Sequence, residues 1–228
     1  MVLTMAGIVV KILGGLNRIL LSRLLGGEGI GLYQMAYPVY ILLLSIIGAG
    51  IPIAVSIMIA EEAAKGHYSG VRRIFHVTLA FMTVVAVVCG LALPFGAHGL
   101  VTMGIVRDSR AFPALAVLAP ALSLSVVACC FRGYFQGLQL MTPTALSQMA
   151  DQFVRVCTML VLAWLLLPKG LEWAAAGAAF GAVPGAAAGL LLITFLYYRY
   201  SRQPMPEDDG VFRVQSPRRI IRRLIVLA

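Results

Sequence analysis

The chain has 228 residues, of which 61% are hydrophobic and only 12% are charged, and its mean hydropathy is +0.93. Soluble domains carry about a quarter charged residues, so this composition excludes an ordinary soluble protein and indicates an integral membrane protein. The net charge of +9 would suggest a nucleic-acid partner in a soluble chain, but here the positions of the charges are explained better by membrane topology.

Apolar runs of about 20 residues, the length that a helix needs to cross a hydrocarbon layer of ~30 Å, recur along the sequence. They predict six spans, near residues 4–22, 38–60, 74–97, 111–130, 143–167 and 173–198. The predicted fold is an all-α six-transmembrane-helix bundle over residues 1–198. A basic cytoplasmic loop is expected at 199–217, and the start of a seventh helix at 218–228.

Prolines and a capping residue refine these spans. Thr142 followed by Pro143 predicts an N-cap and a first helical position at the start of the fifth span. Pro52, Pro120 and Pro184 fall inside the second, fourth and sixth spans, where a missing N–H group frees a backbone carbonyl and permits a kink.

Loop cations predict the orientation, because cytoplasmic loops are enriched in Lys and Arg. The loops after the second, fourth and sixth spans contain most of these residues: Lys65, Arg72, Arg73, Arg132, Arg199, Arg202, Arg213, Arg218, Arg219, Arg222 and Arg223. The opposite loops contain Arg23, Arg107, Arg110 and Lys169. The N-terminus is therefore expected to be cytoplasmic.

The last segment, PRRIIRRLIVLA, stops a few residues into a hydrophobic stretch. About eight apolar residues cannot span a bilayer, which favours a truncated chain whose seventh span is incomplete. The alternative is a short amphipathic surface helix with its four arginines on one side.

Ionisable residues inside the spans need an explanation, because each costs about 2.5 to 3.5 kcal/mol at a span centre on insertion scales. In the first span, Lys11, Gly14 and Arg18 share one helical face, with Asn17 beside Arg18. The fifth span has a polar stripe of its own, formed by Thr144, Ser147, Gln148, Asp151, Arg155 and Thr158.

Asp151 precedes Arg155 by four residues, which is the favourable order for an ion pair on a helix. The embedded charges are then three cations and one anion, so their sum is positive. One interpretation is a structural network between helices, and the other is a polar translocation cavity lined by Lys11, Asn17, Arg18, Gln148, Asp151 and Arg155. A positive cavity favours an anionic cargo, and arginine suits phosphate because its planar fork donates two parallel hydrogen bonds.

Metal and cofactor chemistry is not indicated. The cysteines Cys89, Cys129, Cys130 and Cys157 lie in apolar spans without CxxC spacing, and we expect them to be small buried side chains. The three histidines are scattered over separate elements. We therefore expect no metal and no cofactor.

Three segments carry a family resemblance: SRLLGGEGIGLYQMAYPVY (22–40), GAGIPIAVSIMIAEEAAKG (48–66) and RGYFQGLQLMTPTALSQMADQFVRV (132–156). Together they resemble the polysaccharide biosynthesis and stage V sporulation protein B family. That family belongs to the exporter superfamily that also includes lipid II flippases, O-antigen flippases and multidrug extruders. The order and spacing of the segments match over almost the whole chain.

The resemblance implies a multi-pass transporter of the bacterial cytoplasmic membrane that flips a polyprenyl-diphosphate-linked saccharide, such as a peptidoglycan or spore-cortex precursor, to the outer leaflet. Its members have two six-helix lobes around a V-shaped cavity, so this chain would supply the N-terminal lobe and lack the C-terminal one. Its partners would be that lipid-linked anionic saccharide and membrane lipids, with no nucleic acid.

Lipid II flippases carry important cations on their first helix, and the pattern KILGGLNRILLSRLLG places the matching positions at Lys11, Asn17, Arg18 and Arg23. Where that branch tends to have an Arg-Asp pair, this chain has Asn17 and Arg18. Arg23 and Arg132 are secondary candidates for the site.

The residues leave three alternative functions open. A drug/cation antiporter of the same superfamily would need embedded acidic residues, and Asp151 has an arginine partner. An enzyme would need acidic or histidine clusters at a membrane surface, whereas the acidic run 207–209 reads as a solvated linker. An inactive half-transporter fragment is the remaining alternative.

Overall fold

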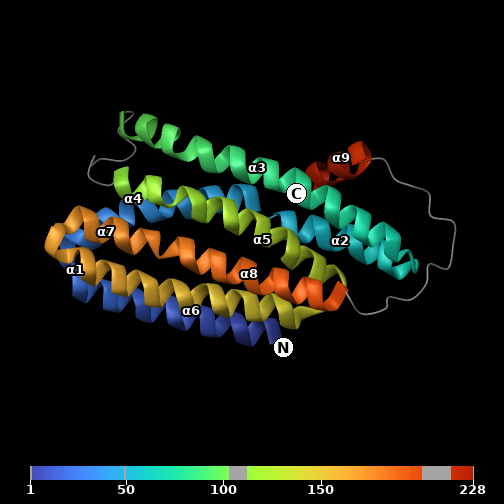
Figure 1. Cartoon of the computed structure of the whole chain (residues 1–228), viewed down its shortest axis with the longest axis horizontal. Coiled ribbons are helices and arrows are strands. Elements are labelled where there is room, and N and C mark those ends of the chain that lie inside the picture. The colour runs from blue at the N-terminus through green and yellow to red at the C-terminus, as the bar shows by residue number, and fades with distance from the viewer. Residues whose placement is uncertain (1, 49, 103–111, 202–216, 228) are drawn as a thin grey trace.

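A computed structural model describes residues 2–48, 50–102, 112–201 and 217–227, and these ranges contain helices and turns but no strand. The helices are α1 (Val2–Gly48), α2 (Gly50–Ala64), α3 (Tyr68–Thr102), α4 (Phe112–Val117), α5 (Ala119–Gly137), α6 (Met141–Leu166), α7 (Leu171–Phe180), α8 (Ala182–Ser201) and α9 (Pro217–Leu227). Figure 1 shows the long helices running roughly side by side. The predicted all-α membrane bundle is confirmed.

Five stretches of these helices are long and apolar enough to cross a membrane. Four of them overlap the predicted third to sixth spans, at Tyr68–Leu93, Phe112–Gly137, Met141–Lys169 and Leu171–Ser201. The first stretch, Leu3–Ala64, is 62 residues long and contains the two remaining predicted spans. A helix of that length would extend about 90 Å at 1.5 Å per residue, so it must fold back to fit a bilayer of ~30 Å.

Gly26 provides that reversal. Its φ of 68° and ψ of −173° are non-helical and lie in a region that is essentially restricted to glycine. In Figure 1 the chain runs along one edge of the bundle, turns back and continues beside α4 and α5. The connection predicted between residues 22 and 38 is therefore wrong in extent. Residues 27–37 are helical, and one glycine makes the turn.

Two of the three prolines expected inside spans sit instead near the starts of helices. Pro120 is the second residue of α5 and Pro184 the third of α8, whereas Pro52 follows residue 49, which lies outside the described residues. The first turn of a helix has N–H groups without intrahelical partners, so proline costs little there. At Pro120 and Pro184 the expected kink is a break between two successive helices.

The predicted cap of the fifth span is wrong by two residues. Helix α6 begins at Met141 with Leu140 as its N-cap, and no side chain caps it, so Thr142 lies inside the helix. The preceding residue, Gln139, has a positive φ of 59°, and the Leu140 N–H donates to the Phe135 carbonyl at 2.8 Å. This bond satisfies a carbonyl group at the end of α5, and no side chain caps the first-turn N–H groups of α6.

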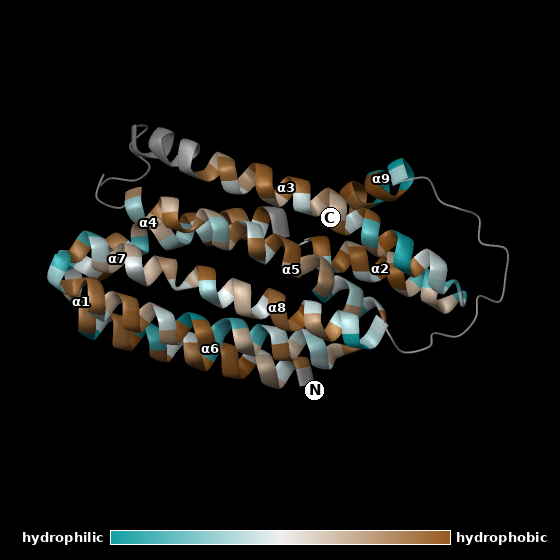
Figure 2. Ribbon diagram, viewed as in Figure 1, coloured by the Kyte–Doolittle hydropathy of each residue, from teal (hydrophilic) through white to brown (hydrophobic). Residues whose placement is uncertain are grey.

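Helix α5 lies at the centre of the core. It packs against α2, α3 and α8, and most of its residues are buried. Gly133 permits the approach to α2, since a Cβ there would lie 2.9 Å from the Pro52 carbonyl oxygen. Figure 2 shows the hydrophobic colouring that dominates the long helices.

The cysteines and the chain end complete the comparison with the sequence. Cys129 and Cys130 are buried as expected, but Cys157 is exposed, so the expectation of burial is wrong for that residue. The basic loop predicted at 199–217 lies mostly outside the described residues, at 202–216. The predicted start of a seventh helix at 218–228 coincides with α9, whose side chains are described below.

Candidate functional site

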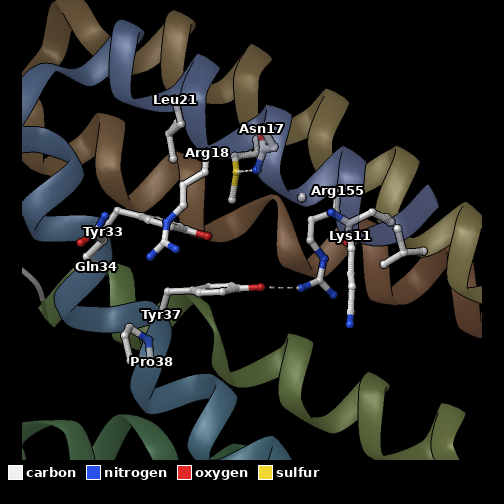
Figure 3. Close-up of a pocket in the computed structure, with 13 residues that line it drawn as sticks. Lys11, Asn17, Arg18, Leu21, Tyr33, Gln34, Tyr37, Pro38 and Arg155 are labelled. Carbon is white, nitrogen blue, oxygen red and sulfur yellow. Dashed lines mark hydrogen bonds between the residues drawn. The ribbon is translucent and has the colours of Figure 1, made fainter. Parts of the chain in front are cut away.

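A cavity of about 330 Å³ lies where the two arms of α1 meet α6 (Figure 3). This volume is at the lower end of the range of ~300–1,000 Å³ that is usual for small-molecule sites. The residues around it come from three separate stretches: Val10, Lys11, Gly14, Asn17, Arg18 and Leu21; Tyr33, Gln34, Tyr37 and Pro38; and Gln152, Arg155 and Met159. The Gly26 reversal is therefore what closes the site.

The first arm of α1 contributes two exposed cations, Lys11 and Arg18, and a buried amide, Asn17. Lys11 and Arg18 are seven residues apart, about two helical turns, so they lie on one side of the helix. The Asn17 Nδ2 group donates to the Met159 sulfur on α6 at 2.8 Å. Gly14 lies where α1 comes close to Gln152, and a Cβ there would be 3.5 Å from the Gln152 Nε2 atom. This face of α1 is thus fixed against α6.

Arg155 reaches the cavity from α6 and is only 9% exposed. Its Nε and Nη2 groups both donate to the Asp151 Oδ1 atom, at 3.3 and 2.9 Å. Its Nη1 group donates to the Tyr37 hydroxyl at 3.4 Å, as the dashed line in Figure 3 shows. A guanidinium has five N–H donors, and these contacts use three of them. Two donors are therefore left for a ligand, counting contacts within the described residues.

Asp151 stands behind Arg155 and outside the cavity lining. Its second oxygen, Oδ2, lies 3.7 Å from the Nη2 group of Arg132 on α5. Two glycines of α8 pack directly on it: a Cβ at Gly185 would lie 2.9 Å from Asp151 Oδ1, and a Cβ at Gly189 would lie 2.9 Å from the Asp151 Cβ. The carboxylate is thus held between two arginines and a glycine surface.

The cavity lining carries an excess of positive charge. Lys11, Arg18 and Arg155 line it, and no acidic side chain is among its described lining residues. Asp151 offsets part of the charge of Arg155, but Arg132 on its other side supplies a further cation. The balance near the cavity is therefore more positive than the sequence alone suggested.

The structure brings together four of the six residues predicted for the cavity, namely Lys11, Asn17, Arg18 and Arg155. It does not place Gln148 or Asp151 on the lining, although Asp151 contacts Arg155. Of the secondary candidates, Arg132 reaches Asp151. Arg23 lines a separate, shallower depression that shares Arg18 and Gln34 with the main cavity.

The sequence reasoning missed the second arm of α1, which contributes Tyr33, Gln34 and Tyr37. The rings of Tyr33 and Tyr37 stack, with centroids 5.1 Å apart and an angle of 20° between their planes. Their spacing of four residues is a helical signal, but they fell in a segment predicted to be a loop. Gln152 was also missed, although it follows Asp151 directly in the polar stripe.

No cluster of three or more His, Cys, Asp or Glu side chains suited to a metal ion occurs in the described ranges. What the cavity offers is cationic N–H donors, amides and two tyrosines. These groups can bind and orient an anion that also carries hydrogen-bonding groups.

Comparison with known proteins places this chain in a family. The polysaccharide biosynthesis protein family matches residues 1–226. Stage V sporulation protein B of Bacillus subtilis is 35% identical over 89% of this chain and 39% of its own length. The lipid II flippase MurJ of the same organism is 31% identical over 86% of this chain and 38% of its own length.

An uncharacterized membrane protein of that organism, YabM, is 30% identical over 88% of this chain and 37% of its own length. No solved structure gives a significant match. The chain spans about two fifths of the length of these curated relatives. The chain belongs to the polysaccharide biosynthesis protein family.

Proposed function

We propose that this chain forms the N-terminal lobe of a flippase that moves a polyprenyl-diphosphate-linked saccharide from the inner to the outer leaflet. Residues 1–198 would make up the lobe, and residues 199–217 would connect it to a second lobe. The curated relatives are long enough to contain such a second lobe. The family membership and the name of the lipid II flippase relative support the class of protein.

The observation that carries the proposal is the cavity with three cations and no acidic lining residue in the described chain. A charge inside a membrane bundle is expensive and usually marks a ligand pathway. If the charges served only to lock helices together, each cation would be expected to have an acidic partner. Arg155 has one, whereas no ion pair is recorded for Lys11 or Arg18 within the described residues.

In the proposed mechanism, the diphosphate binds where these three cations converge. Arg155 would donate its two remaining N–H groups, and Asp151 and Tyr37 would hold the guanidinium in place. The side chains of Lys11 and Arg18 are exposed, so they can change conformation and keep contact with the diphosphate as it moves. Transport then needs no covalent step. It needs only a difference in ligand affinity between an inward-open and an outward-open arrangement of the two lobes.

We further propose that the N-terminus is cytoplasmic. Figure 1 shows the N-terminus, the turn between α2 and α3, the turn between α5 and α6, and the end of α8 toward the same side of the molecule. The described cations Lys65, Arg72, Arg132 and Arg199 lie near these points. Because cytoplasmic loops are enriched in cations, this end of the bundle would face the cytoplasm.

The antiporter alternative receives no comparable support. Such a transporter would bind a cation at an embedded carboxylate, but Asp151 already contacts Arg155 at 2.9 Å and faces Arg132 at 3.7 Å. The remaining carboxylates near helix ends, such as Glu61 and Glu62, lie outside the cavity lining.

The test is a flipping assay with the complete gene product in liposomes, using a fluorescent farnesyl-diphosphate-linked disaccharide as the probe. Arg155→Lys keeps the positive charge and loses the planar fork, so we expect at least a tenfold loss of flipping. Lys11→Gln should also lose most activity. Lys169→Gln removes an exposed cation that is not among the cavity-lining residues and serves as the matched control.

Two results would reject the proposal. One is unchanged flipping in Lys11→Gln, Arg18→Gln and Arg155→Lys at normal protein levels. The other is equal transport of a neutral farnesyl-linked saccharide that has no diphosphate, because the cations would then have no function in selecting the cargo.

A further inference from the structure

Helix α9, far from the α1/α6 cavity in the sequence, carries apolar side chains on one side and arginines on another. It packs against α2 and α3, and its residues Ile220 and Leu224 are buried, at 1% and 0% exposed. These two residues are four apart and share one side of the helix. That side is therefore used for contact with the bundle.

An ion pair fixes the rotation of α9 on the bundle. The Arg223 Nη2 group donates to both oxygens of Glu61 on α2, at 3.0 and 2.8 Å. Both side chains are partly exposed, so the pair adds modest stability, but it defines which way the remaining arginines point. With Arg223 directed at α2, Arg218 and Arg222 lie on a different side of the helix.

That side carries an open groove of about 320 Å³, lined by Arg218, Ile221, Arg222, Ile225 and Val226. The apolar members are strongly exposed, with Ile225 at 63% and Val226 at 78%. An amphipathic helix with arginines beside bulky apolar residues is typical of the membrane interface, where the apolar side chains enter the acyl region and the charges stay at headgroup level.

The surroundings of the groove fit this position. Helix α3 has its own row of exposed apolar residues at Val84, Val87 and Val88, as a lipid-facing helix has. Figure 2 shows hydrophilic and hydrophobic residues side by side on α9, next to the largely hydrophobic α3. The start of α3 carries two further arginines, Arg72 and Arg73.

We propose that the groove on α9 binds an anionic phospholipid, with its phosphate at Arg218 and Arg222 and an acyl chain against Ile225 and Val226. Two features select this occupant. The paired arginines match an anionic headgroup. The adjoining apolar wall of Ile221, Ile225 and Val226 suits a hydrocarbon chain that a free phosphate ion lacks. This site is distinct from the α1/α6 cavity and does not depend on the proposed transport function.

The experiment is native mass spectrometry of the purified complete gene product titrated with phosphatidylglycerol or phosphatidylcholine. Wild-type protein should retain phosphatidylglycerol in preference to phosphatidylcholine. An arginine at an anionic membrane surface is worth about 1 kcal/mol, so Arg218→Gln with Arg222→Gln should weaken phosphatidylglycerol binding about 30-fold. Ile225→Gln keeps both arginines and should weaken it less.

Arg199→Gln, which removes an exposed cation of α8 and leaves α9 intact, is the matched control and should bind as wild type does. Thermal unfolding of each variant checks the fold. If the double variant unfolds early, Arg218→Gln alone makes the same comparison with about a fivefold loss. Equal retention of the two lipids, or unchanged binding in the arginine variants, would overturn the proposal. Displacement of the lipid by millimolar inorganic phosphate would assign a simple anion site and overturn it as well.

Discussion

The two sides of α6 differ in how closely they are packed around the polar residues Asp151 and Arg155. Toward α8 the helix is closed: Gly185 and Gly189 bring the α8 backbone against Asp151, leaving no room for a methyl group. Toward α1 the helix is open, and a cavity of about 330 Å³ separates Arg155 from Lys11 and Arg18. Asp151 and Arg155 are one helical turn apart, yet Asp151 contacts the closely packed backbone of α8 and Arg155 lines the cavity.

This difference separates a structural function from a binding function. On the closed side, the carboxylate has the guanidinium of its own helix and that of Arg132 as partners, and its environment can tolerate little change. On the open side, exposed cations can be altered without disturbing packing. Stability and ligand binding should therefore respond differently to substitutions on the two sides.

The largest expected effect is on the closed side. Asp151→Ala removes the partner of a buried arginine, and an uncompensated buried charge costs about 3–5 kcal/mol. We expect a clear fall in the thermal unfolding temperature of the purified protein. Adding Arg155→Leu to Asp151→Ala should restore part of it, because the unpaired guanidinium is then gone. Wild-type stability in Asp151→Ala would show that Asp151 does not stabilise Arg155.

Next in size is the glycine contact on the same side. Gly185→Ala would place a Cβ 2.7 Å from the Arg155 Cβ and 2.8 Å from the Asp151 carbonyl oxygen. Overpacking of this kind costs about 1–3 kcal/mol, measured as a lowered unfolding temperature. Gly15→Ala is the matched control, since a Cβ at Gly15 meets nothing within 4 Å and helix propensity should slightly favour it. Equal behaviour of the two variants would mean that α6 and α8 are less closely packed.

A similar cost is expected where α1 reverses. Gly26→Ala forces a side chain into a glycine-only conformation and should destabilise the protein by about 1–3 kcal/mol. Ligand binding in the cavity should weaken too, because the reversal brings Tyr33 and Tyr37 to Arg155. Binding of a farnesyl-diphosphate saccharide, followed by calorimetry, is the second readout. Gly27→Ala, at a helical neighbour with open space, should leave both properties unchanged.

Tyr37→Phe tests the border between the two sides. It removes one 3.4 Å hydrogen bond from Arg155 and keeps the ring that stacks on Tyr33. A loss of about 0.5–1.5 kcal/mol is typical of a single hydrogen bond, so the unfolding temperature should fall only slightly. Ligand affinity should fall more, as the guanidinium loses one of its two anchors. An unchanged affinity would show that Asp151 alone positions Arg155.

The smallest effect on stability is expected on the open side. Lys11→Gln changes an exposed side chain, and such substitutions stay within about 0.5 kcal/mol. Affinity for the diphosphate ligand should nevertheless fall, because one of three converging cations is removed. A variant with lower stability and normal affinity would reverse the assignment of the two sides.

Much of this arrangement could be predicted from local patterns. The apolar runs predicted the all-α membrane bundle, because the length of a bilayer-spanning helix is set by the hydrocarbon thickness. The three- and four-residue spacings placed Lys11 with Arg18 and Asp151 with Arg155. What the patterns could not give was the second arm of α1, since residues 23–37 fell between the first two predicted spans.

The amino-acid sequence by itself determined which residues are embedded and which of them share a helical face, because hydropathy and the period of 3.6 residues are local properties. Only the tertiary structure decided which faces meet. The single turn at Gly26 set the register between the two arms of α1, and the glycines of α8 determined that Asp151 is enclosed while Arg155 borders a cavity. Those outcomes depend on close approach between segments far apart in the chain, which no local spacing encodes.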